Sequence, residues 1–392
     1  MTGSRKIENL IFILTSRCNS RCSYCYQTAR DGRRMDWRTL QASIDFALGL
    51  ESNEIELIFL GGEPLLAWNR LRKAVEYAER HAPPPKRLSY ALTTNGLLIT
   101  DEIAAFLDKH KIHTRISFDG LAEMQDYRKK GSFATMDRML ERLRLETPDL
   151  FRHRLRICMT LMPSTIPYLA DSVAYFINKC VQDIAIAPCL TPCPGWTRER
   201  ISELEAQVLS IYDLSRRHFS EVNRVPVAFL RREKHKARNR NRARAMCGVI
   251  DGADLLIDVD GQAYGCVLFT ESYQKYRSDF LAKRMRALRL GNFLGPDFWE
   301  RYAALPNAAR KAELFHHKEK KHSGYGKCKG CTYLDECAVC PVSIGYDPNN
   351  LDPHRVPDFL CAFNRVTLKY RRRFPVMPDP NASLKRLLGL RS

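Results

Sequence analysis

The sequence contains no long hydrophobic run. No apolar stretch approaches the ~20 residues that a membrane-spanning helix requires. The apolar run at 10–15 is followed by polar and cysteine residues without a small-residue cleavage site, and internal repeats are absent. We therefore interpret this run as a first β-strand rather than a signal peptide, and we expect a cytoplasmic globular protein without a membrane partner.

Acidic residues are in short supply. The 392 residues include 44 Asp and Glu against 63 Lys and Arg, and eight of the basic residues lie at 231–244 beside a single Glu. A smaller basic run occupies 369–373. Such runs are typical of a surface that binds an acidic partner or of a solvated insertion. No nucleic-acid motif accompanies them, so a nucleic-acid enzyme is kept only as an alternative.

Cysteine, by contrast, is abundant, with fourteen residues. Disulfide frameworks belong mostly to secreted chains much shorter than this one. In a reducing compartment, thiols clustered at short spacings are typical of metal ligands. A tight turn of backbone can direct neighbouring thiolates at one inorganic centre. We therefore interpret the clustered cysteines as a metal-binding set.

The first 220 residues alternate between strand-like and helix-like patterns. Six strand–helix units in a row predict parallel strands with right-handed crossovers. An open doubly wound sheet and a partial (β/α)6 TIM-like barrel both fit, and the position of every motif at the end of a strand favours the barrel. The predicted strands are 9–15, 54–60, 87–93, 112–118, 154–161 and 183–188, and the predicted helices are 35–50, 67–81, 101–110, 133–145, 165–180 and 198–219.

The second half of the sequence shows a different pattern of residues. A predicted hairpin at 254–269 turns at Asp260-Gly261, few regular periodicities follow, and seven cysteines appear. A loop-rich region of this kind buries little apolar surface, so bound metal would hold it together. The expected organisation is a barrel domain at 1–225, a basic linker or insertion at 226–245, a small cysteine-rich domain at 246–365 and a basic tail at 366–392.

Three cysteines follow the first predicted strand. Cys18, Cys22 and Cys25 form the pattern C-x-x-x-C-x-x-C, with Tyr24 before the last. This pattern resembles the signature loop of the radical S-adenosylmethionine (SAM) enzymes. The resemblance implies a [4Fe–4S] cluster held by three thiolates, with the fourth iron free to chelate SAM. It also implies reductive cleavage of SAM to a 5′-deoxyadenosyl radical, which takes a hydrogen atom from the substrate.

Further motifs at successive strand ends strengthen the resemblance. In "GGEP", Gly61 and Gly62 would let backbone approach the ligand, Glu63 would accept hydrogen bonds from the SAM ammonium, and Pro64 completes the motif. "TTNG" and "SFDG" resemble stretches that line SAM in this family, and Arg128 could pair with the SAM carboxylate. Tyr24, Asp119 and Tyr264 are the candidates for a catalytic base. The cofactor contacts implied by these motifs are Tyr24, Gly61, Gly62, Glu63, Pro64, Asn95, Ser117, Asp119 and Arg128.

The later cysteines resemble the SPASM domain, an auxiliary-cluster extension of peptide- and protein-modifying radical SAM enzymes. The resemblance implies two auxiliary [4Fe–4S] clusters, one held by Cys328, Cys331, Cys337 and Cys361, the other by Cys247, Cys266 and Cys340. A zinc site is the alternative for the C-x-x-C pairs. "CLTPC" at 189–193 could supply a missing ligand to the three-thiolate cluster, whereas Cys158 and Cys180 are predicted core residues.

The subfamily implies a precursor peptide or protein as substrate. We expect oxidative crosslinking of a ribosomally made peptide through a thioether, C–C or C–O bond, with electrons from a flavodoxin or ferredoxin. Formylglycine formation, as in anaerobic sulfatase maturases, is an alternative, although Val267 stands where those enzymes place an Asp. A non-catalytic iron–sulfur electron carrier is another. Because the first predicted strand starts near residue 9, leader recognition would fall to a separate protein or to the basic stretch at 231–244.

Overall fold

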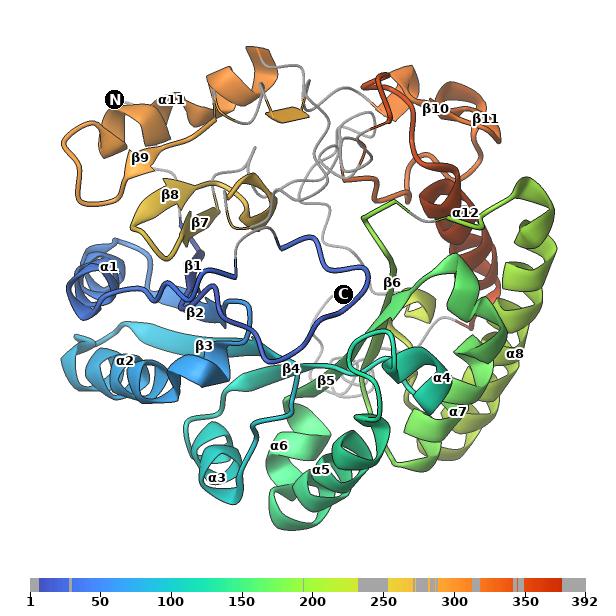
Figure 1. The fold of residues 1–392 in the computed structure, drawn as a ribbon, viewed down its shortest axis with the longest axis horizontal. Coiled ribbons are helices and arrows are strands. Elements are labelled where there is room, and N and C mark those ends of the chain that lie inside the picture. The colour runs from blue at the N-terminus through green and yellow to red at the C-terminus, as the bar shows by residue number, and fades with distance from the viewer. Residues whose placement is uncertain are drawn as a thin grey trace, which may run out of the picture.

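A curved, largely parallel sheet organises the molecule (Figure 1). The computed structural model describes residues 7–27, 30–192, 194–231, 253–270, 272, 281–282, 286, 288–311, 318–340, 344 and 349–375. Within them, nine strands follow the order β6-β5-β4-β3-β2-β1-β7-β8-β9, and all pairs from β6 to β7 are parallel. This is the partial (β/α)6 barrel expected from the sequence, extended beyond β1 by three later strands.

The six barrel strands lie close to their predicted positions. Their apolar residues are buried against the helices, whereas the residues between them line the inner face of the barrel. In β5, for example, burial alternates strictly along the strand. The bounds are β1 Asn9–Ile13, β2 Glu54–Leu60, β3 Arg87–Thr94, β4 His113–Ser117, β5 Leu155–Leu161 and β6 Ile184–Pro188.

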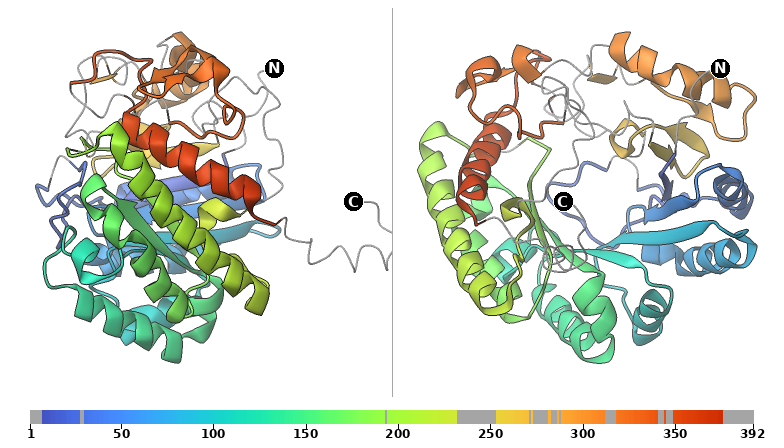
Figure 2. Two further views of the ribbon diagram at one scale, coloured as in Figure 1. Left: turned by 90° about the vertical axis from the view of Figure 1, so that its right-hand side faces the viewer. Right: turned by 180° about the vertical axis from the view of Figure 1, so that it is seen from behind.

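Helices cover the outer, convex face of the sheet (Figures 1 and 2). Their buried positions recur at helical spacing, as in α1, where Leu40, Ile44 and Ala47 face the sheet. Asp36 begins this helix by accepting a hydrogen bond from the Thr39 backbone N–H. The covering helices are α1 Trp37–Gly49, α2 Trp68–His81, α3 Asp101–Lys109, α4 Ala122–Gln125, α5 Phe133–Glu146, α6 Pro148–His153, α7 Leu169–Asn178 and α8 Ile201–Val222, and a 3-10 turn, η1, spans Pro64–Ala67.

The predicted hairpin joins the barrel sheet instead of forming a separate unit. Strand β7 runs parallel to β1, and a side-chain hydrogen bond of 2.7 Å from Asn9 to Asp254 ties their beginnings together. Strands β8 and β9 follow antiparallel. The elements of this half are β7 Asp254–Ile257, β8 Gln262–Tyr264, β9 Gly291–Asn292, α11 Phe298–Lys311, β10 His322–Ser323, β11 Gly326–Lys327, the 3-10 turn η8 Cys328–Gly330 and α12 Asp358–Arg373.

Helix α12 packs along α8 (Figure 2). It runs across position 366, where the sequence predicted a basic tail to begin, so residues 366–373 continue the helix. Tyr370 and Phe374 are buried against Tyr212 of α8. Helix α12 therefore connects the cysteine-rich region to the barrel, and the division into domains stays a prediction.

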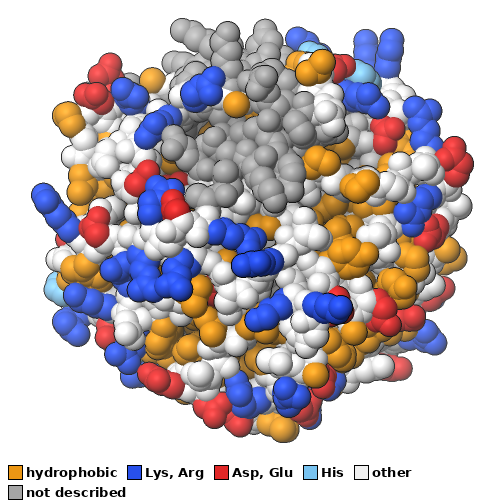
Figure 3. All heavy atoms as spheres, viewed as in Figure 1, with side chains coloured by type: hydrophobic (Ala, Val, Ile, Leu, Met, Phe, Trp, Pro, Cys, Tyr) orange, Lys and Arg blue, Asp and Glu red, His pale blue; other side chains and the backbone are white. Residues whose placement is uncertain are grey.

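Basic side chains are spread over the face shown in Figure 3, with a group on the left between α1 and α2. Of the basic stretch at 231–244, only Arg231 lies within the described residues. Its guanidinium pairs with Asp183 at 2.9 Å and donates to the carbonyls of Val225 and Pro226. Arg231 is thus a structural residue. Within the described part of the chain, no helix is long and apolar enough to cross a membrane.

Candidate functional site

The cysteine loop follows the carboxyl end of β1. Cys18, Cys22 and Cys25 lie close enough for their thiols to interact electrostatically. Burial raises the pKa of Cys18, and it raises that of Cys22 to about 11, an effect that Arg128 opposes. The thiols must therefore lose protons when they bind metal, and the metal itself must drive that loss.

The two glycines of the "GGEP" motif are required by the chain's own backbone. The Gly62 N–H donates to the Thr15 carbonyl at 2.8 Å, which ties the motif to the start of the cysteine loop. A Cβ on Gly61 would lie 2.8 Å from the Thr15 oxygen, and one on Gly62 would lie 2.4 Å from the Arg17 oxygen. Larger residues would push the cysteine loop away from β2.

Glu63 is held by hydrogen bonds from the chain itself, and its predicted contact with SAM stays a prediction. Its side chain is fully buried, and its carboxylate accepts hydrogen bonds from the Leu65 N–H, the Thr94 hydroxyl and the Asn95 N–H at 3.1, 2.6 and 2.7 Å. Burial nevertheless raises the pKa of Glu63. Because both oxygens accept donors from this chain, Glu63 holds the ends of β2 and β3 together. Pro64, also buried, begins η1 directly after it.

Asn95 links the end of β3 to the cysteine loop. Its side-chain amide donates to the Asn19 oxygen at 2.7 Å and lies 4.0 Å from the Cys18 sulfur. Its own oxygen accepts from the Leu97 N–H. Asn95 was predicted as a SAM contact, and the structure places it beside the first cysteine. Ser117, the last residue of β4, is half-buried on the inner face.

Asp119 and Arg128 form a buried pair beneath the loop. The Arg128 Nη2 is 2.8 Å from Asp119 Oδ1, which also accepts from the Thr160 N–H at 2.7 Å. The Tyr24 hydroxyl donates to the other oxygen of Asp119. The Arg128 guanidinium lies 5.3 Å from the centre of the Tyr24 ring. The carboxylate predicted as a SAM contact or base is thus engaged by the chain's own donors.

Arg128 makes several contacts within the chain, and its predicted pairing with SAM stays a prediction. Its Nη2 donates to Asp119, to the Cys158 carbonyl and to the Thr160 hydroxyl, so this nitrogen is occupied. Its Nε is buried and finds no partner among the described residues. The positive charge sits next to Cys22. Arg128 therefore brings a cation to the base of the cysteine loop.

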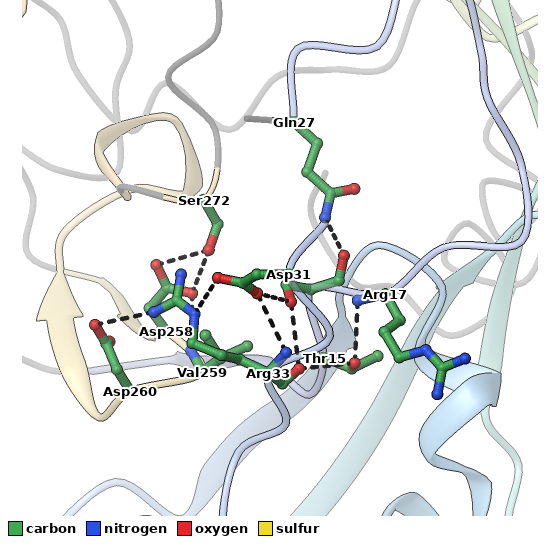
Figure 4. Close-up of polar contacts among 10 residues, drawn as sticks. Thr15, Arg17, Gln27, Asp31, Arg33, Asp258, Val259, Asp260 and Ser272 are labelled. Atoms are coloured by element: carbon green, nitrogen blue, oxygen red, sulfur yellow. Dashed lines mark hydrogen bonds and ion pairs between the residues drawn. The ribbon is translucent and has the colours of Figure 1, made fainter. Parts of the chain in front are cut away.

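A polar cluster ties the returning end of the loop to the β7–β8 hairpin (Figure 4). Arg33 pairs with Asp31 at 2.6 Å and with Asp260 at 3.6 Å, and Asp31 accepts from the Ser16 hydroxyl at 2.5 Å. Gln27 donates to the Ser16 carbonyl at 2.6 Å. The loop is therefore held at both ends by the chain itself.

The hairpin contributes a buried carboxylate to the same region (Figure 4). Asp258 is 2% exposed and accepts from the Ser272 hydroxyl and the Val259 N–H, both at 2.8 Å. Burial raises its pKa. No motif singled this residue out, because its burial depends on the pairing of β7 with β1.

Four of the predicted auxiliary-cluster ligands come together. The thiols of Cys328, Cys337 and Cys361 interact electrostatically with one another and with Cys331. Side-chain donors point at three of these sulfurs: the Ser323 hydroxyl at 3.1 Å from Cys361, the Asn364 amide at 3.6 Å from Cys337, and the Arg365 guanidinium at 3.9 Å from Cys331. Hydrogen bonds to cluster sulfurs tune reduction potential, so this donor set fits an iron–sulfur group.

The second auxiliary set is only partly described. Cys247 lies outside the described residues, whereas Cys266 and Cys340 are half-buried. Cys266 lies near Tyr26, which also faces Cys25; burial and these two thiols raise the pKa of Tyr26 to about 12. Tyr26 therefore stands between the N-terminal trio and Cys266.

Two buried lysines beside these cysteines were missed by sequence reasoning. Lys321 is 2% exposed, its Nζ has no hydrogen-bond partner among the described residues, and its nearest charges are the thiols of Cys328 and Cys340. Lys318 is 4% exposed and faces Cys337. Lys is rarely fully buried without a counter-charge, so anionic groups at the cysteines would explain both. In the sequence both lie within a run of charged residues that looks solvated.

The cysteines outside the predicted clusters differ in how far they are exposed. Cys180 was predicted in the core, but it is exposed, because it occupies the left-handed turn (φ 65°) after α7. Cys158 is half-buried on the inner face of β5. Of the "CLTPC" stretch, Cys193 lies outside the described residues. Thr191 reaches the cysteine loop through a hydrogen bond of 3.4 Å to the Tyr24 carbonyl.

Among the described residues, no group of three or more His, Cys, Asp or Glu side chains is gathered closely enough to hold a single metal ion. The thiols of the N-terminal trio, and those of Cys328, Cys331, Cys337 and Cys361, nevertheless lie close enough to interact electrostatically.

Comparison with known sequences finds similarity mainly in the first half of the chain. Residues 12–163 match the family model described as the Radical SAM superfamily. An uncharacterized protein of Methanocaldococcus jannaschii is 33% identical over 182 residues, 46% of this chain and 62% of that protein. The radical SAM cyclopropyl synthase TigE of Paramaledivibacter caminithermalis is 24% identical over 230 residues, 54% of this chain and 47% of TigE. The first curated relatives are thus matched over roughly half to three fifths of their own length.

Solved structures share the fold over nearly the whole chain. The structure of anSMEcpe with bound AdoMet and the Kp18Cys peptide superposes with a TM-score of 0.70 at 19% identity, covering 94% of this chain and 97% of that one. Streptococcus suis SuiB bound to S-adenosylmethionine gives a TM-score of 0.58 at 15% identity, covering 91% and 77%. At these identities the likeness concerns the fold.

Proposed function

We propose that the chain is a radical SAM enzyme that modifies a peptide or protein substrate, on the basis of the family match over residues 12–163. The superfamily implies a [4Fe–4S] cluster and bound SAM. The observation that carries the proposal is the trio Cys18, Cys22 and Cys25 after the end of β1, three thiols that interact electrostatically in a loop bound to the "GGEP" turn. When bound, the cluster and SAM would supply a 5′-deoxyadenosyl radical that takes a hydrogen atom from the substrate.

The chain's own residues prepare the site for that chemistry. Asn95 and the backbone of Gly62 fix the cysteine loop against β2 and β3. The buried set of Tyr24, Asp119 and Arg128 fixes it against β4 and β5, and Arg128 places a positive charge beside Cys22. These contacts restrain the position of the loop, as a site that generates a reactive radical requires.

Three features support a peptide substrate and auxiliary clusters. TigE is a cyclopropyl synthase of the radical SAM class, and one structure in the comparison is SuiB bound to its precursor peptide SuiA. The cysteine group at 328–361 has sulfur-directed donors that would hold a [4Fe–4S] cluster. We therefore infer an oxidative modification, such as a thioether, C–C or C–O crosslink, in which auxiliary clusters accept an electron from the substrate. The electron donor to SAM would be a flavodoxin or ferredoxin, and a separate protein could hold the leader.

A second candidate is formylglycine formation on a sulfatase. Cysteine-type anaerobic sulfatase-maturating enzyme of Clostridium perfringens is 24% identical over 238 residues, 56% of this chain and 63% of that enzyme. The apolar Val267 after Cys266 removes the carboxylate expected of that chemistry. Mass spectrometry after anaerobic incubation separates the two: a sulfatase peptide would gain an aldehyde, and a crosslinked precursor would lose hydrogens without one.

Cleavage of SAM tests the proposal most directly. Reconstituted protein given SAM and a strong reductant should release 5′-deoxyadenosine, measured by liquid chromatography. Cys22→Ser should lower that yield at least a hundredfold, because the cluster loses a ligand. Cys180→Ser, at an exposed position away from the loop, should retain it. Wild-type protein that binds iron and sulfide but forms no 5′-deoxyadenosine would instead identify an electron carrier.

A further inference from the structure

A small basic cavity lies at the opposite end of the barrel from the cysteine loop. It has a volume of about 200 Å³ and is bordered by the amino-terminal ends of β2, β4 and β5 and by the residue before β6. The cysteine loop, by contrast, follows the carboxyl end of β1. The cavity therefore plays no part in the site described above. Its lining residues are Glu56, His113, Arg115, Arg152, His153, Arg154, Leu155, Arg156, Asp183 and Arg224.

The positive charge in this cavity exceeds the negative charge available to balance it. Five arginines line it against two acidic residues. Asp183 is already shared between Arg156, at 2.7 Å, and Arg231, at 2.9 Å. Arg154 pairs with Asp108 and Asp149 outside the cavity lining, at 3.1 and 2.8 Å.

Three of the lining arginines have no ion-pair partner among the described residues. Arg115, Arg152 and Arg224 form no ion pair or side-chain hydrogen bond among the described residues, and only Glu56 is left as an unengaged acid of the lining. Arg115 is the most unusual of them, because it is half-buried on the inner face of β4. A cation that is withdrawn from water without a counter-charge costs free energy.

The pairing of β4 with β5 adds to this free-energy cost, because it brings two of the arginines together. Arg115 of β4 pairs directly with Arg156 of β5, and both side chains border the cavity. Like charges on directly neighbouring positions of adjacent strands repel each other. An anion bound between the two guanidinium groups would offset both the repulsion and the missing solvation.

We propose that this cavity binds a phosphate-bearing ligand through Arg115 and Arg156, with Arg224 and Arg152 at its mouth. Guanidinium groups present planar forks that match phosphate oxygens, and three unpaired arginines suit an ion with more than one negative charge. A volume of about 200 Å³ corresponds to roughly seven water molecules at ~30 Å³ each. It accommodates a phosphoryl or diphosphoryl group but not a whole buried nucleotide. The site is independent of the proposed function.

Titration of the full-length protein with inorganic phosphate and with pyrophosphate, by isothermal calorimetry at 0.15 M salt, tests the proposal. We expect saturable binding near one ligand per chain. Arg115→Gln should weaken it at least tenfold, and Arg224→Gln, at an exposed position, provides a second variant should the first fail to fold. Arg80→Gln removes the same charge from the exposed end of α2 and should leave the affinity within twofold of wild type.

The outcomes distinguish a specific anion-binding site from nonspecific attraction of anions to a basic protein. Binding of adenosine diphosphate with the same Arg115 dependence would identify a nucleotide whose diphosphate enters the cavity, and binding of inorganic phosphate alone would identify the free ion; both support the site. No saturable binding would overturn the proposal, as would equal losses in Arg115→Gln and Arg80→Gln. An RNA oligonucleotide that binds with Arg115 dependence, while phosphate and pyrophosphate do not, would overturn it in favour of a nucleic-acid surface.

Discussion

Lys321 carries a positive charge into the interior of the cysteine-rich region. It is 2% exposed, and it faces Cys328 of one predicted auxiliary cluster and Cys340 of the other. Burial lowers its pKa, while the two thiols oppose that effect. A cation between two anionic clusters would stabilise their reduced, more negative states, so its position bears on electron transfer between them.

Removing this charge should change redox behaviour more than folding. Lys321→Met keeps an apolar stem of similar length but deletes the ammonium. We expect the midpoint potential of an auxiliary cluster to fall by roughly 60 mV, a tenfold change in a one-electron equilibrium. Redox titration followed by electron paramagnetic resonance measures it. Lys320→Met, one position away but exposed, is the matched control, and equal potentials in the two variants would contradict the role of Lys321.

Single residues also show what the spacing of a motif can predict and what it cannot. The spacing of Cys18, Cys22 and Cys25 predicts a common loop, because short intervals in one turn leave little choice of geometry. The same motifs predict that Glu63 contacts SAM, but they do not indicate that its carboxylate accepts three donors from η1 and from the end of β3. Hydrogen-bond partners at long sequence separation cannot be deduced from one motif. The burial of Lys321 was not predicted for the same reason.

At the level of elements, helix α12 fastens the cysteine-rich region to the barrel. It begins beside Cys361, a predicted cluster ligand, and ends at Phe374, which is 1% exposed between Tyr212 and Phe219 of α8. Lys369 adds an ion pair to Glu205, but both side chains are 35% exposed, so the pair contributes little. The aromatic contact is therefore the main fastening.

Truncating this contact should loosen the helix. Phe374→Ala removes a buried ring, which costs about 3–5 kcal/mol at core positions. We expect faster hydrogen exchange throughout α12 together with a lower apparent free energy of unfolding. Leu351→Ala, at a position that is 84% exposed, should change stability by less than about 0.5 kcal/mol. Unchanged exchange in α12 of the Phe374 variant would show that other contacts hold the helix.

Strand positions were predictable where the pattern was local. The prediction 54–60 coincides with β2, because a short run rich in apolar residues bounded by polar ones is typical of a buried parallel strand. The pairing of β7 with β1 was not predictable. It joins residues about 245 positions apart, and the hairpin pattern says nothing about its outer neighbour. Helix α12 was missed because its basic last turn resembles a solvated tail.

At the scale of the whole molecule, apolar burial is unevenly distributed. One large cluster of buried residues runs through the barrel and across β7 and β8 into part of α12. The cysteine-rich region has a separate cluster of three buried residues among those described, Val339, Ile344 and Val356, packed against Cys337 and Cys361. We therefore expect metal bound at the predicted ligand cysteines to add to the stability of this part of the chain.

Metal removal should therefore unfold one part of the molecule and spare the other. After chelation of iron, we expect the amides of 318–340 to exchange as in an unfolded chain, while those of β1 to β6 stay protected, because metal-binding energy serves as folding energy only in the cysteine-rich region. Cys337→Ser should reproduce this effect without chelation and lower bound iron by about four atoms per chain. Cys180→Ser should do neither, since its thiol is exposed and remote from the clusters. Equal protection of 318–340 with and without iron would mean that packing alone orders the region.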